Sequence, residues 1–329
     1  MPKFELTDSF QSDLWDSLVD NSPQGTVFIE SDFLSSTSTR HEKYLIFKGQ
    51  DLKAGICVCI SENGEDCILD DLVVYNGLIF REDERKKDSR ARLERFELTE
   101  FTIDFLTKRF RTIEISLSPH FEDIRPFLWH NYHEQAPGKR FIVDVRYTSY
   151  LDISGLGDPA SEETNPVFQN MIRLRQRGVR KMRQIESRFS QSDDPNLIAD
   201  FYRKMMNAKG ETVPQEKLDR MRSLSAYLIK SGKGAQFRVT DSSGPDIYAI
   251  NFGLDRKRAY ALFAAGKDTS PDMYEGTIAY WDSFHSLARN SGVSEIDFEG
   301  VNSPKRSWFK LGFGGDIRAY YQVSLKRSD

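Results

Sequence analysis

The feature that most constrains the fold is a pattern of short apolar segments and longer amphipathic segments that occurs in both halves of the chain. The short segments have the length of strands, and the longer ones repeat apolar residues every three or four positions. Strands mixed with helices are typical of α/β and α+β folds. Because 329 residues are enough for two ordinary domains, we expect two units, residues 1–155 and residues 156–329, each with a mixed central sheet flanked by helices.

These segments define the elements that we expect in each unit. The first unit should contain a long helix within 81–110 and strands at 43–49, 52–61, 66–75, 112–118 and 141–154. The second unit should contain helices at 193–210, 214–232 and 273–292 and strands at 235–241, 247–255, 258–266, 294–300 and 319–325. The similar layout of the two units hints at a structural duplication.

The charge balance narrows the classes of partner. The chain has 46 basic and 50 acidic residues and a formal net charge of −4, so we expect no DNA partner, and any basic site must be local. No segment approaches the roughly 18 uninterrupted apolar residues that a membrane span needs. The odd number of cysteines (Cys57, Cys59 and Cys67) and the polar N-terminus favour a reducing, cytoplasmic location.

A basic segment, residues 165–189, connects the two expected units. Its apolar residues recur every three or four positions and predict one helix face formed by Val167, Met171, Leu174, Gly178, Met182, Ile185 and Phe189. Seven lysines and arginines lie between residues 173 and 188 against one acid, Glu186. This excess is either a solvated helix face or a local site for the phosphates of a substrate or an RNA, with Arg173, Arg177 and Arg180 as candidate contacts.

Residues 295–315, EIDFEGVNSPKRSWFKLGFGG, concentrate groups that carry chemistry. A short strand ends in two carboxylates, Asp297 and Glu299, which alternation places on one face, with Ile296 and Phe298 on the other. A turn rich in Gly, Asn, Ser and Pro leads to Lys310, which aromatic residues precede and glycines follow. A carboxylate at a strand end is either a turn cap or, once desolvated, a general base with a raised pKa.

The same C-terminal region resembles the closing segment of FemAB-like transferases. The similar motifs are the helix from Trp281 to Ala288, the strand end Asp297-Phe298-Glu299-Gly300 and the segment 309–314, FKLGFG. More weakly, 112–119 (TIEISLSP), 146–154 (RYTSYLDIS) and 173–184 (RLRQRGVRKMRQ) are similar to a strand, a T-x-x-L-D-L strand and an acceptor-holding helix of that family. The family's Gly-Pro-x-x-Asp is replaced by Gly77-Leu78, with no acid at the same offset.

The resemblance implies two tandem GNAT-type acyltransferase domains and a transfer reaction. It assigns Lys310 to the stabilisation of charge that develops during transfer, although a surface lysine is the simpler interpretation. Asp297 or Glu299 would take the proton of the attacking amine. We expect Phe309 and Trp308 at the donor site, with Lys305 and Arg306 available to hold a phosphate.

The identity of the acyl donor depends on the segment 266–281. Acetyl-CoA enzymes of the GNAT type carry a glycine-rich loop that binds pyrophosphate at a helix start. This segment has Gly276 but lacks the paired glycines. We therefore expect aminoacyl-tRNA rather than acyl-CoA as the co-substrate, and no bound cofactor.

The segment 123–134, DIRPFLWHNYHE, is dense in aromatic and basic residues. Arg125, Trp129, His130 and Tyr132 could line an acceptor pocket, or they could form a structural aromatic cluster. His130 and His133 are three positions apart and could share a helix face as metal ligands. Because no third ligand is evident, we expect no metal site.

The sequence thus predicts a cytoplasmic transferase that moves an aminoacyl or acyl group onto an amine of a cell-envelope or small-molecule precursor. An alternative is an acyl-CoA-dependent N-acyltransferase acting on an amino sugar or nucleotide-sugar. A second alternative is a binding module without catalysis, whose basic helix holds RNA or a phosphorylated ligand.

Overall fold

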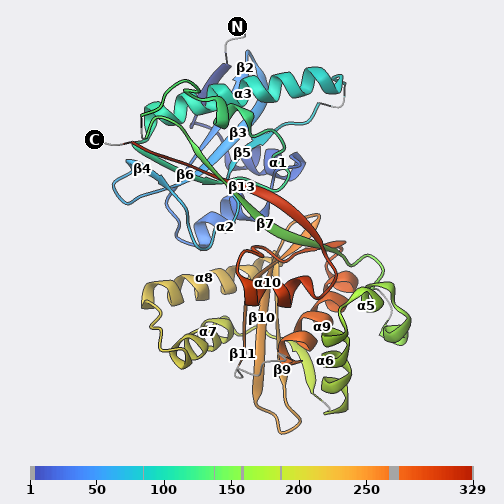
Figure 1. The fold of residues 1–329 in the computed structure, drawn as a ribbon. Helices are drawn as coiled ribbons and strands as arrows, with labels where there is room; N and C mark the ends of the chain where they lie inside the picture. The colour runs from blue at the N-terminus through green and yellow to red at the C-terminus, as the bar shows by residue number, and fades with distance from the viewer. Residues whose placement is uncertain are drawn as a thin grey trace. The chain divides into compact units, whose positions relative to one another are not determined.

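The computed structural model describes residues 4–83, 85–136, 138–156, 159–185, 187–266 and 274–327, and Figure 1 shows the order of their elements. The chain forms two compact units, Met1–Arg146 with Ala319–Asp329, and Tyr147–Arg318. The expected boundary between residues 155 and 156 therefore lies too far along the chain, and the last strand belongs mainly to the first unit. The reason is strand pairing, since Gln322–Lys326 pairs with Thr112–Ser116 of the first unit.

The first unit is a mixed sheet with helices. Its strands follow the order β1-β2-β3-β4-β6-β13, β5 also pairs with β3, and only β4 and β6 are parallel among the pairs described here. The division between the units falls within β7 (Ile142–Asp152) and within β13 (Asp316–Lys326). The other elements of this unit are β1 (Phe4–Thr7), α1 (Ser12–Asn21), η1 (Val27–Ile29), α2 (Ser31–Ser36), β2 (His41–Lys48), β3 (Asp51–Ile60), β4 (Asp66–Ile68), β5 (Gly77–Phe80), α3 (Asp88–Arg109), β6 (Thr112–Ser116) and α4 (Arg125–Trp129).

Strand β3 is buried on both faces, which explains its nearly continuous apolar sequence. Its residues Ala54, Ile56 and Val58 pack in one core cluster with residues of α3. Gly55 points the opposite way, where a side chain would collide with Trp15 of α1. The alternation of strand side chains therefore places α3 and α1 on opposite faces of this sheet.

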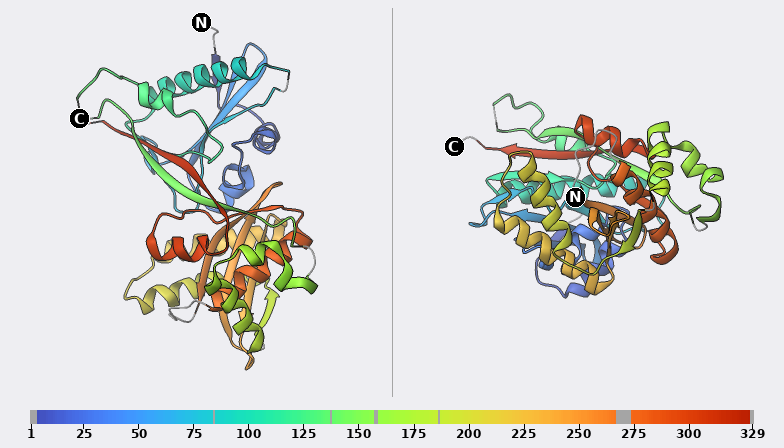
Figure 2. Two further views of the ribbon diagram at one scale, coloured as in Figure 1. Left: turned by 45° about the vertical axis from the view of Figure 1, so that its right-hand side comes forward. Right: turned by 90° about the horizontal axis from the view of Figure 1, so that it is seen from below.

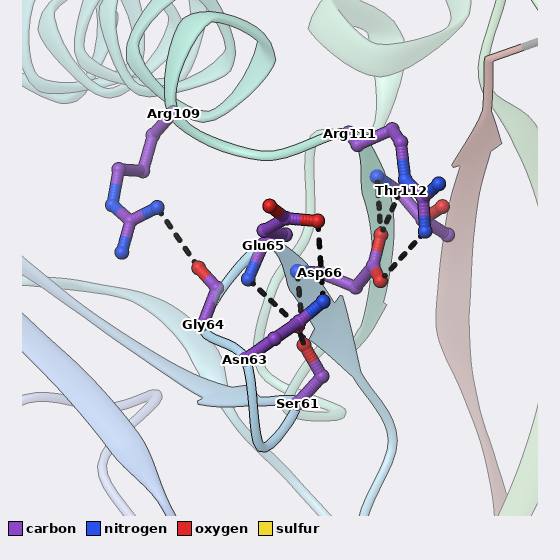
Figure 3. A network of polar contacts seen from close by, with 8 residues as sticks. All are labelled: Ser61, Asn63, Gly64, Glu65, Asp66, Arg109, Arg111 and Thr112. Atoms are coloured by element: carbon purple, nitrogen blue, oxygen red, sulfur yellow. Dashed lines mark hydrogen bonds and ion pairs between the residues drawn. The ribbon is translucent and has the colours of Figure 1, made fainter. Parts of the chain in front are cut away.

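A polar network connects the β3–β4 hairpin with the end of α3 and the start of β6 (Figure 3). The Asp66 carboxylate accepts hydrogen bonds from Arg111 Nη2 at 3.2 Å and from the backbone N–H of Thr112 at 3.2 Å. Arg109 donates to the carbonyl oxygen of Gly64 at 2.9 Å. These contacts lie beside the parallel pairing of β4 with β6 and help to hold its register.

The second unit is also a mixed sheet, with the order β7-β12-β11-β10-β9-β8. Strands β11 and β12 are parallel, and the other described pairs of this sheet are antiparallel. Its further elements are η2 (Pro159–Thr164), α5 (Pro166–Asn170), α6 (Arg173–Gln184), β8 (Arg188–Gln191), α7 (Leu197–Ala208), α8 (Gln215–Ser231), β9 (Gly234–Thr240), β10 (Asp246–Leu254), β11 (Arg258–Gly266), α9 (Tyr274–Asn290), β12 (Glu295–Asp297) and α10 (Pro304–Leu311).

Helices cover both faces of this second sheet (Figures 1 and 2). On β10, Ile250 packs in the cluster that contains residues of α6 and α9. The adjacent Ala249 packs in a separate cluster with residues of α7. The expectation of mixed sheets flanked by helices is therefore confirmed in each unit.

No helix in the described ranges is long and apolar enough to cross a membrane.

The basic connector is not one helix, as we expected, but two helices followed by a strand. Met171 and Ile172 are extended, with ψ of 150° and 149°. The N–H of Ile172 donates to the carbonyl oxygen of Gly312 at 3.0 Å, so a tertiary contact replaces the helical hydrogen bond. In α6 the buried face is Arg175, Gly178, Val179 and Met182, whereas the expected Ile185 is exposed.

Several other elements follow the sequence pattern closely, and some do not. The expected end of α8 at Gly232 is confirmed, because this glycine adopts the left-handed conformation at φ 70°. The segment 66–75 forms only the three-residue strand β4, and strand β5 and helices α1 and α10 were not expected. Helix α10 begins with Pro304 after Ser303, an arrangement typical of a helix start.

We expect Phe313→Ala to lower the free energy of unfolding of the second unit by about 3–5 kcal/mol, because Phe313 is fully buried among aromatic rings. Trp308→Ala, five residues earlier, should change it by less than about 0.5 kcal/mol, because Trp308 is 75% exposed. Urea unfolding of both variants measures the difference. Equal losses in the two variants would contradict this assignment of core and surface.

Candidate active site

The candidate active site lies at the end of β12, in the second unit. This three-residue strand pairs with β11 on one side and with β7 on the other. Its last residue, Asp297, is fully buried, and Glu299 two residues later is 8% exposed. Ile296 and Phe298 lie in the apolar core, so two carboxylates are enclosed where the strand turns away from the sheet.

Asp297 caps the turn that follows the strand. Its Oδ1 accepts a hydrogen bond from the backbone N–H of Glu299 at 2.7 Å. The Thr148 hydroxyl lies 2.5 Å from the same oxygen and 3.0 Å from the carbonyl oxygen of Glu299. Of the two roles that we considered for a carboxylate here, Asp297 therefore has the geometry of the turn cap.

Glu299 has the features of a base. Its backbone is in the left-handed region at φ 55°, which costs energy for a residue other than glycine. Its Oε1 is buried and has no hydrogen-bond partner among the described residues. Burial raises the pKa of Glu299 to about 8, with a further increase from Asp297 and an opposing effect of the Lys310 charge.

Lys310 lies on α10 and contacts the same turn. Its Nζ donates to the carbonyl oxygens of Phe298 at 2.6 Å and of Gly300 at 3.3 Å, the two residues that flank Glu299. Its surroundings lower the Lys310 pKa, chiefly because burial disfavours the charged form, while Glu299 and Asp297 oppose that decrease. Part of the Lys310 side chain is exposed, but its ammonium is held by two backbone carbonyl oxygens. Lys310 is therefore not the surface lysine of the simpler interpretation.

The expected donor contacts separate into buried and exposed groups. Phe309 is buried in the core, where its ring packs 5.3 Å from Tyr280, and the guanidinium of Arg175 lies 4.4 Å above it. The predicted packing of Phe309 against the donor is therefore not supported by its place in the core. Lys305, Arg306 and Trp308 are exposed on α10 and stay predicted contacts.

The basic helix α6 carries less free charge than its sequence indicates. Arg180 forms two hydrogen bonds with Glu163, at 2.7 and 2.6 Å. Arg183 binds Asp282 and Glu162. The acids come from η2 and α9, which no local pattern connects with this helix. Arg173 and Arg177 are exposed and stay predicted contacts for an anion, but Arg180 is already paired.

The aromatic and basic segment around α4 lies in the first unit. Arg125 pairs with Asp123 at 2.6 Å and lies 5.5 Å from the ring of Phe96 and 5.4 Å from that of Trp129. Trp129 and Tyr132 are half exposed. His130 follows the last residue of α4, so His130 and His133 do not share the helix face that we considered possible for two metal ligands. An acceptor role for Arg125, Trp129, His130 and Tyr132 stays a prediction.

The place where GNAT enzymes hold the donor's pyrophosphate falls partly outside the described residues, because residues 267–273 are not among them. Gly276, on α9, lies against Tyr248, and a side chain at this position would come within 3.1 Å of that ring. Gly276 therefore allows close packing of α9 on β10.

Sequence reasoning missed Thr148 and Tyr280. Thr148 is the first residue of the T-x-x-L-D motif, which was the available signal, and it contacts both Asp297 and Glu299. Burial raises the pKa of Tyr280 well above its usual value, with smaller contributions from Tyr248 and Glu299. Its ring lies 6.0 Å from Phe298, and no periodicity in the sequence indicates that proximity.

We expect Glu299→Gln to remove a pH-dependent loss of stability. A carboxyl with a pKa of about 8 in the folded state and its usual 4.5 when unfolded holds its proton only in the folded protein between these values. The wild type should therefore lose free energy of unfolding, relative to the variant, as the pH rises from 5 to 8. Urea unfolding at several pH values tests this, with exposed Asp316→Asn as control. A constant difference across that range would show that Glu299 titrates normally.

Comparisons with known proteins agree on the fold. No protein-family model matches the chain, and no curated protein sequence matches it significantly. Among solved structures, FemX is similar over 96% of both chains at 11% identity, with a TM-score of 0.62.

Two further solved structures are similar over nearly their whole lengths. A tandem GNAT protein from the clavulanic acid biosynthesis pathway is 8% identical over 99% of this chain and 100% of that chain, with a TM-score of 0.54. L-PGS from Bacillus licheniformis is 12% identical over 97% and 93% of the two chains, with a TM-score of 0.53. The chain therefore has the tandem GNAT fold, as its resemblance to FemAB-like transferases implies.

Proposed function

We propose that this protein is a transferase that moves an aminoacyl or acyl group onto an amine, with Glu299 as the general base. The observation that carries the proposal is the buried Glu299 carboxylate, which has an unpartnered oxygen and a pKa of about 8. A base with such a pKa exchanges protons near neutral pH, where amine chemistry occurs. The tandem GNAT fold and its similarity to FemX and L-PGS support the reaction class.

The proposed step is an attack by the amine nitrogen on the carbonyl carbon of the donor. A C–N bond forms, and the C–O bond of an aminoacyl ester or the C–S bond of a thioester breaks. Glu299 takes the proton of the amine, and the leaving oxygen or sulfur receives a proton in return. The step takes one proton from the amine, gives one proton to the leaving group and changes no oxidation state, so it requires no metal or redox partner.

Lys310 has two parts in this proposal. Its hydrogen bonds to the carbonyl oxygens of Phe298 and Gly300 hold the turn that positions Glu299. An ammonium has three donors, so the remaining N–H is available for the oxyanion that develops during transfer. Asp297 and Thr148 then act as positioning residues, because their contacts define the backbone of the same turn.

For the co-substrates, we propose aminoacyl-tRNA as the donor and an amine of a cell-envelope or small-molecule precursor as the acceptor, in the cytoplasm. The absence of paired glycines in the segment 266–281 supports this donor. An acyl-CoA donor with an amino sugar or nucleotide-sugar acceptor is the alternative. The pairing of Arg180 and Arg183 with acids counts against a purely RNA-binding or phospholigand-binding module.

We expect Lys310→Met to move the rise of transfer rate with pH to higher pH, because the Lys310 charge lowers the pKa of Glu299. Glu299→Gln should reduce the rate by about 10²–10⁴-fold and abolish that rise. Single-turnover rates from pH 6 to 9 measure both effects. If Lys310→Met slowed transfer at every pH equally, Lys310 would have no electrostatic effect on the base. Full activity of Glu299→Gln would refute the proposed base.

Binding of the donor is tested by thermal unfolding with CoA, acyl-CoAs and charged tRNA. A ligand at about 100 times its dissociation constant stabilises a folded protein by about 2.7 kcal/mol. We expect charged tRNA to raise the midpoint and CoA compounds to leave it unchanged. A saturable increase with acyl-CoA would replace the proposed donor with the alternative one. An unchanged midpoint with both donor classes would leave the transferase proposal without a donor and refute it.

A further inference from the structure

A cavity of about 230 Å³ lies in the first unit, between α3 and the segment that follows β6. Helix α3 contributes Arg92, Arg95 and Thr99, which share one face because they are three and four positions apart. A buried cavity of about 150 Å³ can hold benzene, so this cavity has room for one aromatic ring and a small polar group. The sequence analysis assigned no function to Arg92, Arg95 or Thr99.

The floor of the cavity is aromatic. Phe80 and Phe121 are both buried, and their rings stack with centroids 5.9 Å apart and an interplanar angle of 24°. Buried Gln24 fixes this floor, because its Nε2 donates to the carbonyl oxygen of His120 at 2.9 Å and its Oε1 accepts from the N–H of Phe80 at 3.3 Å. The polar groups of Gln24 are thus used by the protein, and the two rings form part of the cavity wall.

Two arginines and two acids line the cavity, and among the described residues some of them are paired with an opposite charge while others are not. Arg92 is exposed, and none of the residues described here forms an ion pair or hydrogen bond with its guanidinium. Arg95 lies 5.8 Å above the ring of Phe80 and 3.6 Å from Glu82 at the surface. Of the two acids that line the cavity, Asp123 is neutralised by Arg125 at 2.6 Å, and Glu122 is exposed.

We propose that this cavity binds a small molecule that carries an oxyanion, a carboxylate or a phosphate ester, on an aromatic group. Arg92 and Arg95 would bind the oxyanion through charge-assisted hydrogen bonds, for which guanidinium geometry is well suited. The aromatic group would contact the parts of Phe80 and Phe121 that line the cavity. The proposal is independent of the transfer chemistry, because every lining residue belongs to the first unit and Glu299 belongs to the second.

The test is calorimetric titration of the full chain with phenyl phosphate and phenylacetate. We expect Arg92→Gln to weaken binding of the better probe at least about tenfold, because it removes a charged donor. The matched control is Arg90→Gln, an exposed arginine of the same helix that does not line the cavity, and it should change binding less than twofold. The ratio of the two dissociation constants identifies the preferred oxyanion.

Further probes test the two parts of the site without altering the protein. Benzylamine carries the ring with the opposite charge and should not bind. Inorganic phosphate and acetate lack the ring and should bind at least about tenfold more weakly than the corresponding phenyl compounds. Absence of binding by both phenyl oxyanions would overturn the proposal. Equal weakening by Arg92→Gln and Arg90→Gln, or equal binding of benzylamine, would also overturn it.

Discussion

The pairing of β12 between β11 and β7 is the constraint on which the candidate site depends. This strand has three residues, yet it brings together segments about 150 positions apart in the chain, as the contact between Thr148 and Asp297 shows. Because β12 has a paired strand on each side, its end is enclosed, and so are the carboxylates of Asp297, its last residue, and of Glu299. Asp297, Glu299 and Lys310 then lie around one turn, whose backbone polar groups are bound by the side chains of Asp297 and Lys310.

Burial has opposite effects on the two charged groups that flank this turn. It raises the pKa of Glu299 and lowers that of Lys310, since removal from water disfavours both charged forms. Their mutual attraction opposes each shift. The pKa values of the carboxyl and the ammonium group are thereby both shifted toward neutral pH. Proton transfer during amine acylation is most efficient when the pKa of the base lies near the working pH. The left-handed backbone of Glu299 indicates that the fold accepts local strain to keep this group in place.

Several elements were predictable because their signals are local. The apolar run of β3, the end of α8 at Gly232 and the long amphipathic helices follow from the side-chain periodicity and conformational preferences of neighbouring residues. The helix predicted for the connector, residues 165–189, was wrong because two tertiary contacts override its apolar periodicity. The N–H of Ile172 binds Gly312, and the charged Arg175 is buried against Phe309, a position that apolar patterns assign to Leu174.

By itself, the sequence determined that the chain has two units of mixed strands and helices, and it indicated Asp297, Glu299 and Lys310 as the residues most suited to acyl-transfer chemistry. Only the tertiary structure decided which contacts each of these residues makes. Asp297 caps the turn because Thr148 and the Glu299 N–H reach its Oδ1. Oε1 of Glu299 is buried and has no hydrogen-bond partner among the residues that the structure describes. The tertiary structure also decided that β13 completes the first sheet and that Arg180 and Arg183 are neutralised. The reason is the same in each case, since these contacts join residues distant in the chain and no local pattern encodes which distant partner a group will meet.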